Sequence, residues 1–258
     1  MLNKNAGMQL GLGLIGIGRS WGYKVSTVPE EQEVIAFLNN AMNAGITFFD
    51  TAPAYGVSEV RFGNFLKTLD KEQRSKIVVA TKFGEFYDEE SLSTYVDHSY
   101  KALCKSVDKS IDRLGVINIL QLHKTNPEVL KSADLLNSMQ YAKQKGINVF
   151  GASVSDIESG RIVCENDIFS VIQIPYNIHL DYLEDILELA KNRNKFVIIN
   201  RPFNMGEMMY KSSTQEELIS EAFKFITKRA FHGVILTGTK SIQHLQENIR
   251  GFQNALEK

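Results

Sequence analysis

The sequence predicts an α/β fold, a single (β/α)8 TIM barrel over residues 1–258, and three observations support this prediction. Short strand-like segments alternate with amphipathic helical segments eight times along the chain. The strand-like segments are apolar runs without polar alternation, which is typical of parallel strands covered on both faces. The length of 258 residues is close to the roughly 250 of one such barrel. Right-handed crossovers between successive parallel strands then favour a closed barrel over an open sheet.

The first half of the chain contains four predicted strand–helix units. A proline in the first turn and an apolar face at helical spacing indicate the first helix, and Ser58 is a candidate N-cap for the second. An apolar stripe indicates a long third helix, and Gly146 is a candidate C-cap for the fourth. The stripe consists of Leu92, Val96, Leu103, Val107, Ile111 and Leu114. In chain order the units are Leu12–Gly16 and Pro29–Ala44, Thr47–Asp50 and Ser58–Leu69, Ile77–Thr81 and Ser91–Leu114, and Ile117–Leu122 and Ala133–Lys145.

The second half repeats the pattern with four further units. Each strand is a short apolar run, and the last helix aligns four apolar side chains at helical spacing: Ile242, Leu245, Ile249 and Phe252. In chain order these units are Val149–Ala152 and Asp156–Glu165, Val171–Ile174 and Tyr182–Asn192, Phe196–Asn200 and Thr214–Arg229, and Gly233–Leu236 and Ile242–Ala255.

The glycine-rich start of the chain, GLGLIGIG, offers only a weak match to the fingerprint of an open dinucleotide-binding sheet. The glycines continue into Gly18 and Gly22, and the next helix begins only near Pro29. A helix that begins so late cannot place its N-terminus against a pyrophosphate. We therefore interpret these glycines as part of the first barrel strand.

Composition and charge exclude several classes of protein. Thirty acidic and twenty-nine basic residues give a net charge of −1, and no basic block indicates binding to nucleic acid or to a membrane. Cys104 and Cys164 lie far apart without metal-ligand spacing, so we expect free thiols and no metal site. The amino-terminal segment shows no signal peptide or membrane span, and we expect a cytoplasmic protein.

Three successive predicted strands end in ionisable residues. Asp50 ends the second, Lys82 follows the third and His123 follows the fourth, while Tyr55 lies in a turn-rich segment just after Asp50. The catalytic groups of a barrel enzyme lie at the carboxyl ends of its strands. The four side chains therefore predict a proton-transfer site at one end of the barrel. Groups that can donate or accept a proton would meet there with a charged group that can shift their pKa.

These residues, in the settings FDTAPAYG, VATKFG and LQLH, resemble the catalytic tetrad of the aldo-keto reductases. The resemblance extends over most of the chain through five further segments: KSIDRLG, KGINVFGAS, VIQIPYN, RPFNMG and GTKSIQHLQEN. It implies a barrel that binds an extended nicotinamide dinucleotide, NADPH or less commonly NADH, without a Rossmann domain. It also implies reduction of an aldehyde or ketone to an alcohol by hydride transfer.

The resemblance implies a role for each member of the tetrad. Tyr55 would be the general acid, and the Lys82 ammonium would ease the release of its proton, since a free phenol has a pKa of about 10. Asp50 would hold and neutralise Lys82. His123 would orient the carbonyl group and stabilise the charge that develops on its oxygen.

The resemblance also assigns residues to the cofactor. Ser153 and Gln173 match positions that bind the nicotinamide carboxamide, although Val154 stands where the family commonly has Asn. Asn200 or Arg201 replaces the aromatic residue that often stacks on the nicotinamide ring. Lys240 is expected to meet a 2′-phosphate as a point charge. The adenosine end of the cofactor would be held by Gly238, Thr239, Lys240, His244, Glu247 and Asn248.

The substrate is less clearly indicated. Trp21, after the first strand, and Phe83, after Lys82, are candidate walls of a substrate pocket, with Phe86 and Tyr87 as similar candidates. The sequence ends shortly after the last predicted helix. We therefore expect a pocket that is either open to bulky or polar carbonyl compounds, such as sugar derivatives, or completed by a neighbouring subunit. The oligomeric state is not predicted.

Two alternatives remain open from the sequence. One is a non-catalytic barrel that binds a nicotinamide nucleotide as a sensor or partner subunit. The other is a Schiff-base aldolase that uses Lys82 as its nucleophile. An aldolase would not need Asp50 and Tyr55 at this spacing, so the reductase is the favoured hypothesis.

Overall fold

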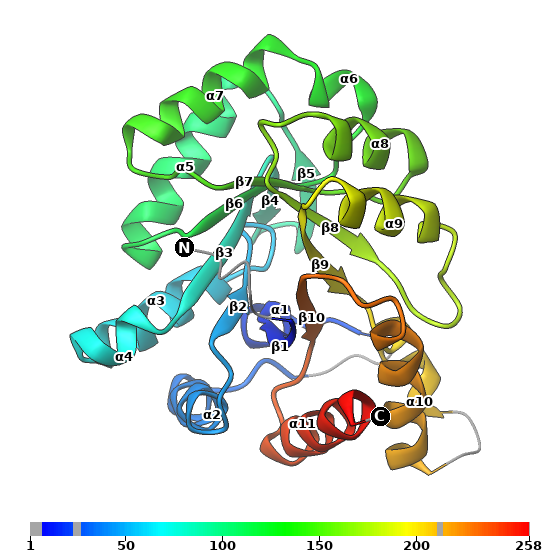
Figure 1. Ribbon diagram of the computed structural model, residues 1–258. Helices are drawn as coiled ribbons and strands as arrows, with labels where there is room; N and C mark the ends of the chain where they lie inside the picture. Colours follow the sequence, from blue (N-terminus) through cyan, green and yellow to red (C-terminus); the bar gives the residue numbers. More distant parts are fainter. Residues whose placement is uncertain (1–6, 23–26, 211–213, 258) are drawn as a thin grey trace.

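The predicted barrel is present in the computed structural model, which describes residues 7–22, 27–210 and 214–257 (Figure 1). Eight parallel strands close in the order β1-β10-β9-β8-β7-β6-β3-β2. Residues 1–6, on which part of the signal-peptide expectation rests, lie outside the described residues. The barrel strands are β1 (Met8–Gly13), β2 (Phe48–Asp50), β3 (Val78–Phe83), β6 (Ile119–Leu122), β7 (Phe150–Ser153), β8 (Val171–Pro175), β9 (Phe196–Asn200) and β10 (Gly233–Thr237).

Helices surround the barrel because their apolar stripes need a covered surface (Figure 1). In α5, for example, Leu103, Val107 and Leu114 are buried, and the Ser99 side chain caps the first turn. The main helices are α2 (Glu31–Asn43), α3 (Ser58–Thr68), α5 (Tyr100–Leu114), α7 (Ala133–Gln144), α8 (Ile157–Glu165), α9 (Glu184–Asn192), α10 (Gln215–Thr227) and α11 (Ile242–Leu256). Shorter helical turns are α1 (Ile15–Gly18), α4 (Lys71–Ser75), α6 (Pro127–Leu130) and the 3-10 segment η1 (Asn204–Tyr210).

The largest error of the sequence analysis concerns the predicted helix Ser91–Leu114. Its first part is instead β5 (Ser93–Val96), which pairs in a β-hairpin with the preceding β4 (Glu85–Asp88), and the helix begins only at Tyr100. Leu92, assigned to the apolar stripe, has a φ of 51° and is 72% exposed at the hairpin turn. Stacking of Phe86 on Tyr95 across the hairpin stabilises the strand pairing over a helical extension.

Smaller differences concern the starts of elements. β1 begins at Met8, four residues earlier than predicted, and its predicted end is the short helix α1. Ser58 does not cap α3; its hydroxyl donates to the Leu14 carbonyl at 2.9 Å and thereby ties α3 to the end of β1. Lys82 lies within β3 and not after it.

Strand alternation separates two layers of side chains. In β3, Ala80 belongs to the core inside the barrel, whereas Val79 and Phe83 belong to the core between barrel and helices. Lys82 shares the inward face with Ala80 because successive side chains of a strand point to opposite faces. The inner core stops below the carboxyl ends of the strands, which are therefore free to carry polar side chains. It consists of Phe48, Ala80, Ile119, Val171, Phe196, Ile198, Val234 and Leu236.

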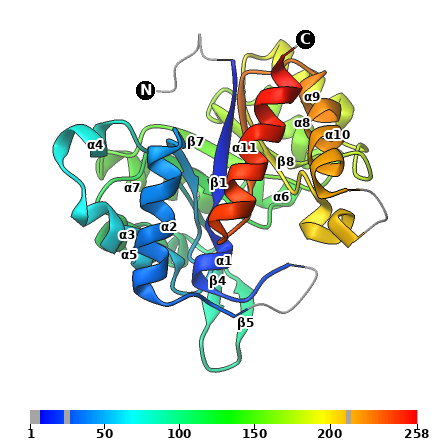
Figure 2. The same ribbon diagram turned by 90° about the horizontal axis from the view of Figure 1, so that it is seen from below.

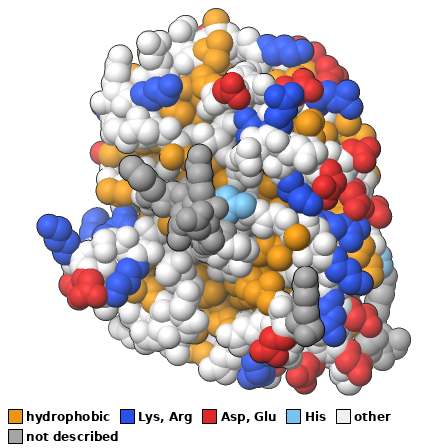
Figure 3. Space-filling view, in the orientation of Figure 1, with side chains coloured by type: hydrophobic (Ala, Val, Ile, Leu, Met, Phe, Trp, Pro, Cys, Tyr) orange, Lys and Arg blue, Asp and Glu red, His pale blue; other side chains and the backbone are white. Residues whose placement is uncertain are grey.

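The carboxyl ends of the strands lie at the lower side of Figure 2, where α1 and the β4–β5 hairpin are located. Figure 3 shows the opposite face, on which acidic and basic side chains lie intermingled beside α9 and α10. In the part of the chain that the structure describes, no helix has the length and hydrophobicity needed to cross a membrane.

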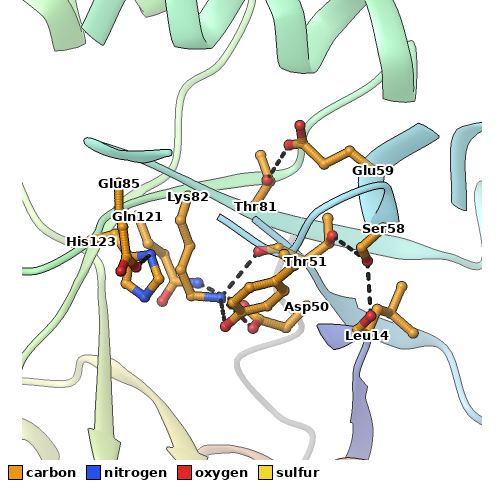
Figure 4. A network of polar contacts seen from close by, with 11 residues as sticks. Leu14, Asp50, Thr51, Ser58, Glu59, Thr81, Lys82, Glu85, Gln121 and His123 are labelled. Carbon is orange, nitrogen blue, oxygen red and sulfur yellow. Dashed lines mark hydrogen bonds and ion pairs between the residues drawn. The ribbon is translucent and has the colours of Figure 1, made fainter. Parts of the chain in front are cut away.

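A buried acidic residue joins the barrel to two helices. Glu59 of α3 is fully buried and accepts hydrogen bonds from Thr81 at 2.7 Å, Ser110 at 2.8 Å and Arg113 at 2.9 Å. Figure 4 shows Glu59 and Thr81 on the side of β3 opposite to Lys82. A buried carboxylate is tolerated because every contact compensates part of its lost hydration.

We predict that Glu59→Ala lowers the free energy of unfolding by about 2–4 kcal/mol, since three donors lose their shared acceptor. Urea denaturation measures the change. Glu72→Ala is the matched control, because Glu72 forms an exposed pair with Lys76 and should contribute less than about 1 kcal/mol. Equal effects of the two substitutions would contradict a structural role of the buried cluster.

Candidate active site

Asp50, Tyr55 and Lys82, predicted from the sequence to lie together, meet at the carboxyl end of the barrel. Figure 4 shows the Lys82 side chain directed at Asp50. Lys82 Nζ donates to Asp50 Oδ2, to the Thr51 carbonyl at 3.1 Å and to Tyr55 Oη at 3.1 Å. These contacts use all three donors of the ammonium group. The Lys82 ammonium group therefore links the Tyr55 hydroxyl to Asp50 and holds it near β3.

The Lys82 ammonium remains charged although the side chain is fully buried. Burial by itself would lower the pKa of Lys82, but the charge of Asp50, with contributions from Tyr55, outweighs burial and raises this pKa. Asp50 is held from its other side, since Gln121 Nε2 donates to Asp50 Oδ1 at 3.0 Å. Gln121 was not predicted as a site residue, although it lies in the segment LQLH; it is in β6, two residues before His123.

Tyr55 lies in a tight turn that packs against α1. Its N–H donates to the Ala52 carbonyl at 3.0 Å, and the following residue, Gly56, has a φ of 61°. Gly18 approaches the same turn so closely that a Cβ on it would lie 2.0 Å from the Tyr55 carbonyl oxygen. The backbone around Tyr55 is therefore held by its neighbours on both sides.

Burial raises the pKa of the Tyr55 phenol, and the Lys82 ammonium acts in the opposite direction without overcoming it. The influence of Lys82 on this pKa thus has the predicted direction, while burial makes the net shift upward. A raised pKa keeps the phenol protonated at neutral pH, which is the state that a proton donor requires.

His123 faces the tyrosine across the site. Its ring lies edge-on to the Tyr55 ring, with centroids 6.1 Å apart, and its Nδ1 is 2.8 Å from Glu85 Oε2. Burial lowers the pKa of His123, while the Glu85 hydrogen bond opposes this shift. Glu85 was missed in the sequence because the hairpin that carries it was not foreseen. Its only sequence signal is an acidic residue two positions after the strand that contains Lys82.

The nicotinamide residues suggested by the sequence lie side by side, since Ser153 at the end of β7 pairs in register with Gln173 of β8. Gln173 Oε1 is buried without a hydrogen-bond partner in the described part of the chain, and so is Asn200 Oδ1 at the end of β9. An unpaired buried carbonyl oxygen is costly. Two such acceptors on the neighbouring strands β8 and β9 fit the amide N–H groups of a nicotinamide carboxamide.

The remaining predicted cofactor residues lie farther around the barrel mouth. Arg201 follows β9 with a φ of 55° and an exposed side chain. Lys240 lies before α11 and donates to the Thr27 carbonyl, which links this loop to the segment that precedes α2. Gly238 and Thr239 belong to the same loop, and α11 carries His244, Glu247 and the buried Asn248.

The two predicted walls of a substrate pocket differ in position. Trp21 is 43% exposed after α1, on the same face of the barrel as the tetrad. Phe83 is buried in the core between barrel and helices, on the face of β3 opposite to Lys82. The expectation for Phe83 is therefore wrong, because strand alternation directs its side chain away from the site.

Comparisons with known proteins agree with this geometry. The model of the aldo/keto reductase family matches residues 9–222. The L-galactose dehydrogenase of Arabidopsis thaliana is 27% identical over 233 residues, which are 84% of this chain and 69% of that protein. A Pseudomonas aeruginosa structure assigned to the aldo-keto reductases has a TM-score of 0.80 at 25% identity, covering 96% of this chain and 90% of the other. The holo form of an aldo-keto reductase from Bacillus halodurans, with a TM-score of 0.75 at 20% identity and 97% and 87% coverage, shows the same fold.

The His123–Glu85 pair predicts a pH-dependent contribution to stability. Burial alone would raise the pKa of Glu85, but the hydrogen bond and charge of His123, helped by Thr94 and Lys124, lower it to about 2. A carboxyl group with a lowered pKa stabilises the fold above its ordinary value of 4.5, and this contribution is lost as the pH falls toward 2.

We therefore predict that Glu85→Gln lowers the free energy of unfolding most above pH 5, and that its difference from the parent chain shrinks between pH 4.5 and 2. Urea denaturation across this range tests the prediction. Glu128→Gln, at an exposed position of α6, is the control and should change stability little at any pH. A Glu85→Gln difference that does not vary with pH would exclude this linkage.

Proposed function

Because this chain belongs to the aldo/keto reductase family, a family of NAD(P)H-dependent oxidoreductases, we propose that it reduces an aldehyde or ketone with NADPH and uses Tyr55 as the general acid. The observation that carries this proposal is the contact of Tyr55 Oη with the buried Lys82–Asp50 pair. Lys82 donates to the phenol oxygen, so the phenol proton is free to point toward a substrate. The phenol is thereby oriented before any substrate arrives.

The tetrad can assist both charge and proton transfer at the carbonyl oxygen. NADPH supplies a hydride when it is bound. Tyr55 donates its proton to the oxygen as negative charge develops there, and the nearby Lys82 ammonium stabilises the phenolate that remains. Asp50 and Gln121 keep the ammonium in place.

His123 orients the same oxygen in this proposal. Glu85 contacts Nδ1, which leaves Nε2 as the ring nitrogen available to a substrate. Nε2 donates to a carbonyl oxygen only when it carries a proton. The negative charge of Glu85 favours the doubly protonated ring, whereas burial, the larger effect, lowers the pKa of His123. Glu85 is therefore proposed as a positioning residue for His123.

Residues at both ends of the cofactor site support NADPH as the reductant. The acceptors of Gln173 and Asn200 suit the carboxamide at one end. At the other end, α11 has no acidic residue in its first turn, unlike α2, α9 and α10. A helix N-terminus without acidic side chains is suited to a phosphate group, and Lys240 precedes it. A polyhydroxylated substrate is in line with the relative described as an L-galactose dehydrogenase.

The two alternatives fit the geometry less well. A Schiff-base aldolase needs a neutral amine, whereas all three donors of Lys82 are engaged and its pKa is raised. A non-catalytic nucleotide-binding barrel would have no use for an oriented phenol beside a buried cation. The reductase remains the proposal that uses every member of the tetrad.

We predict that Tyr55→Phe lowers turnover at least about a hundredfold while NADPH affinity changes less than about twofold, because the hydroxyl acts only as the alkoxide forms. Turnover is followed by NADPH absorbance and affinity by calorimetry. Tyr100→Phe, which removes a hydroxyl from an exposed position of α5, is the control and should retain full turnover. If Tyr55→Phe retains nearly the turnover of the parent chain, Tyr55 is not the general acid. Trapping of a carbonyl compound on Lys82 by borohydride would favour the aldolase.

We predict that Lys240→Gln weakens NADPH binding about tenfold and leaves NADH binding unchanged, since only NADPH carries the 2′-phosphate. Calorimetry with each nucleotide measures both affinities. Lys67→Gln, at an exposed position of α3, is the matched control for loss of one positive charge. An equal loss of affinity for NADPH and NADH would contradict the assignment of Lys240 to the 2′-phosphate. If the parent chain binds neither nucleotide, the proposed oxidoreductase activity is contradicted.

A further inference from the structure

Arg19 is a cation at the mouth of the site that the proposed chemistry does not use. It follows α1, and its guanidinium lies between two aromatic rings, 5.2 Å from the centroid of Trp21 and 5.4 Å from that of Tyr87. Arg19 Nε is buried without a hydrogen-bond partner among the described residues. The side chain as a whole is only partly buried, so the guanidinium is held in place and still reaches solvent.

Two contacts place Arg19 beside the catalytic groups. On one side, Val57 N–H donates to the Gly18 carbonyl at 3.3 Å, and a Cβ on Gly56 would lie 3.3 Å from Arg19 Cβ. Arg19 therefore adjoins the turn that carries Tyr55. On the other side, Tyr87 lies two residues after Glu85 on the same face of β4, and Glu85 contacts His123. Figure 2 shows α1, which directly precedes Arg19, next to this hairpin, in agreement with the contact of Arg19 with Tyr87.

Among the described residues, the other cations near the site have acidic partners and Arg19 does not. Lys82 is paired with Asp50, and Lys124 Nζ lies 3.8 Å from Glu85 Oε1. Within residues 7–22, 27–210 and 214–257, no carboxylate forms an ion pair with Arg19. A guanidinium offers a planar fork of donors, and stacking between aromatic rings orients that fork.

We propose that Arg19 binds an oxyanionic group, a carboxylate or a phosphate, on the carbonyl substrate, and that it determines the preference for such substrates. The inference rests on the proposed reductase. A substrate whose carbonyl oxygen lies between Tyr55 and His123 extends outward past the loop after α1, where its anionic end meets the guanidinium. That contact provides an acceptor for a guanidinium whose Nε has none among the described residues.

The experiment compares matched substrates with NADPH: succinic semialdehyde against butanal, and glyceraldehyde phosphate against glyceraldehyde. We expect kcat/KM to be about tenfold or more higher for the anionic member of at least one pair, and the pair with the larger ratio identifies the group. Arg19→Gln should lower kcat/KM for the anionic substrate about ten- to a hundredfold, as expected for one charged hydrogen bond, and change it less than about twofold for the neutral one. Arg19→Lys should retain part of the preference.

Lys124→Gln removes a nearby positive charge without removing the fork, and should reduce the preference less than about threefold. If Arg19→Gln does not fold, the parent chain still tests the inference, because the preference for the anion should fall as salt concentration rises. Equal activity on charged and neutral partners, or equal losses on both in Arg19→Gln, would overturn the role of Arg19. Absence of carbonyl reduction with every substrate would instead overturn the proposed reductase.

Discussion

The ion pair of Lys82 and Asp50 is the constraint on which the rest of the site depends. Both charges lie inside the barrel, where transfer from water costs several kcal/mol for each ion unless every polar atom finds a partner. The three donors of Lys82 and both oxygens of Asp50 are engaged, so neither group can shift without leaving the other exposed to this cost. Tyr55 accepts one of the Lys82 hydrogen bonds and thereby offsets part of the cost of burying the ion pair.

Much of the barrel and part of the site could be predicted from sequence because both follow from local pattern. Apolar runs that end in Asp50, Lys82 and His123 place these residues near the carboxyl ends of parallel strands, and closure of the barrel brings those ends together. Phe83 was assigned to the same end but points the other way, since alternation along β3 separates it from Lys82. The predicted ends of β2 and β6 match the structure, whereas β3 continues two residues beyond its predicted end. A difference of one residue along a strand reverses the direction of a side chain.

The residues that sequence analysis missed depend on contacts between distant segments. Glu85 matters because of His123, and the hairpin that carries it was interpreted as the start of a helix. Leu92 and Val96 fit the helical spacing of α5 by coincidence, whereas the stacking of Phe86 on Tyr95 determines the observed strands. Gln121 of β6 donates to Asp50 of β2 over the intervening strand β3, a contact that no spacing in the sequence indicates. Such pairings arise from tertiary structure, which overrides local propensity.

The close approach of Gly18 to the Tyr55 turn links two loops that would otherwise vary independently. A methyl group on Gly18 has no room beside the Tyr55 carbonyl, and one on Gly56 would lie 2.6 Å from the Gly18 carbonyl. Exchanging either loop between relatives would therefore require exchanging both, as a single cassette. Substitutions meant to alter substrate selectivity are therefore better placed away from the contact of Gly18 with Gly56, in the segment after Arg19 and in the β4–β5 hairpin.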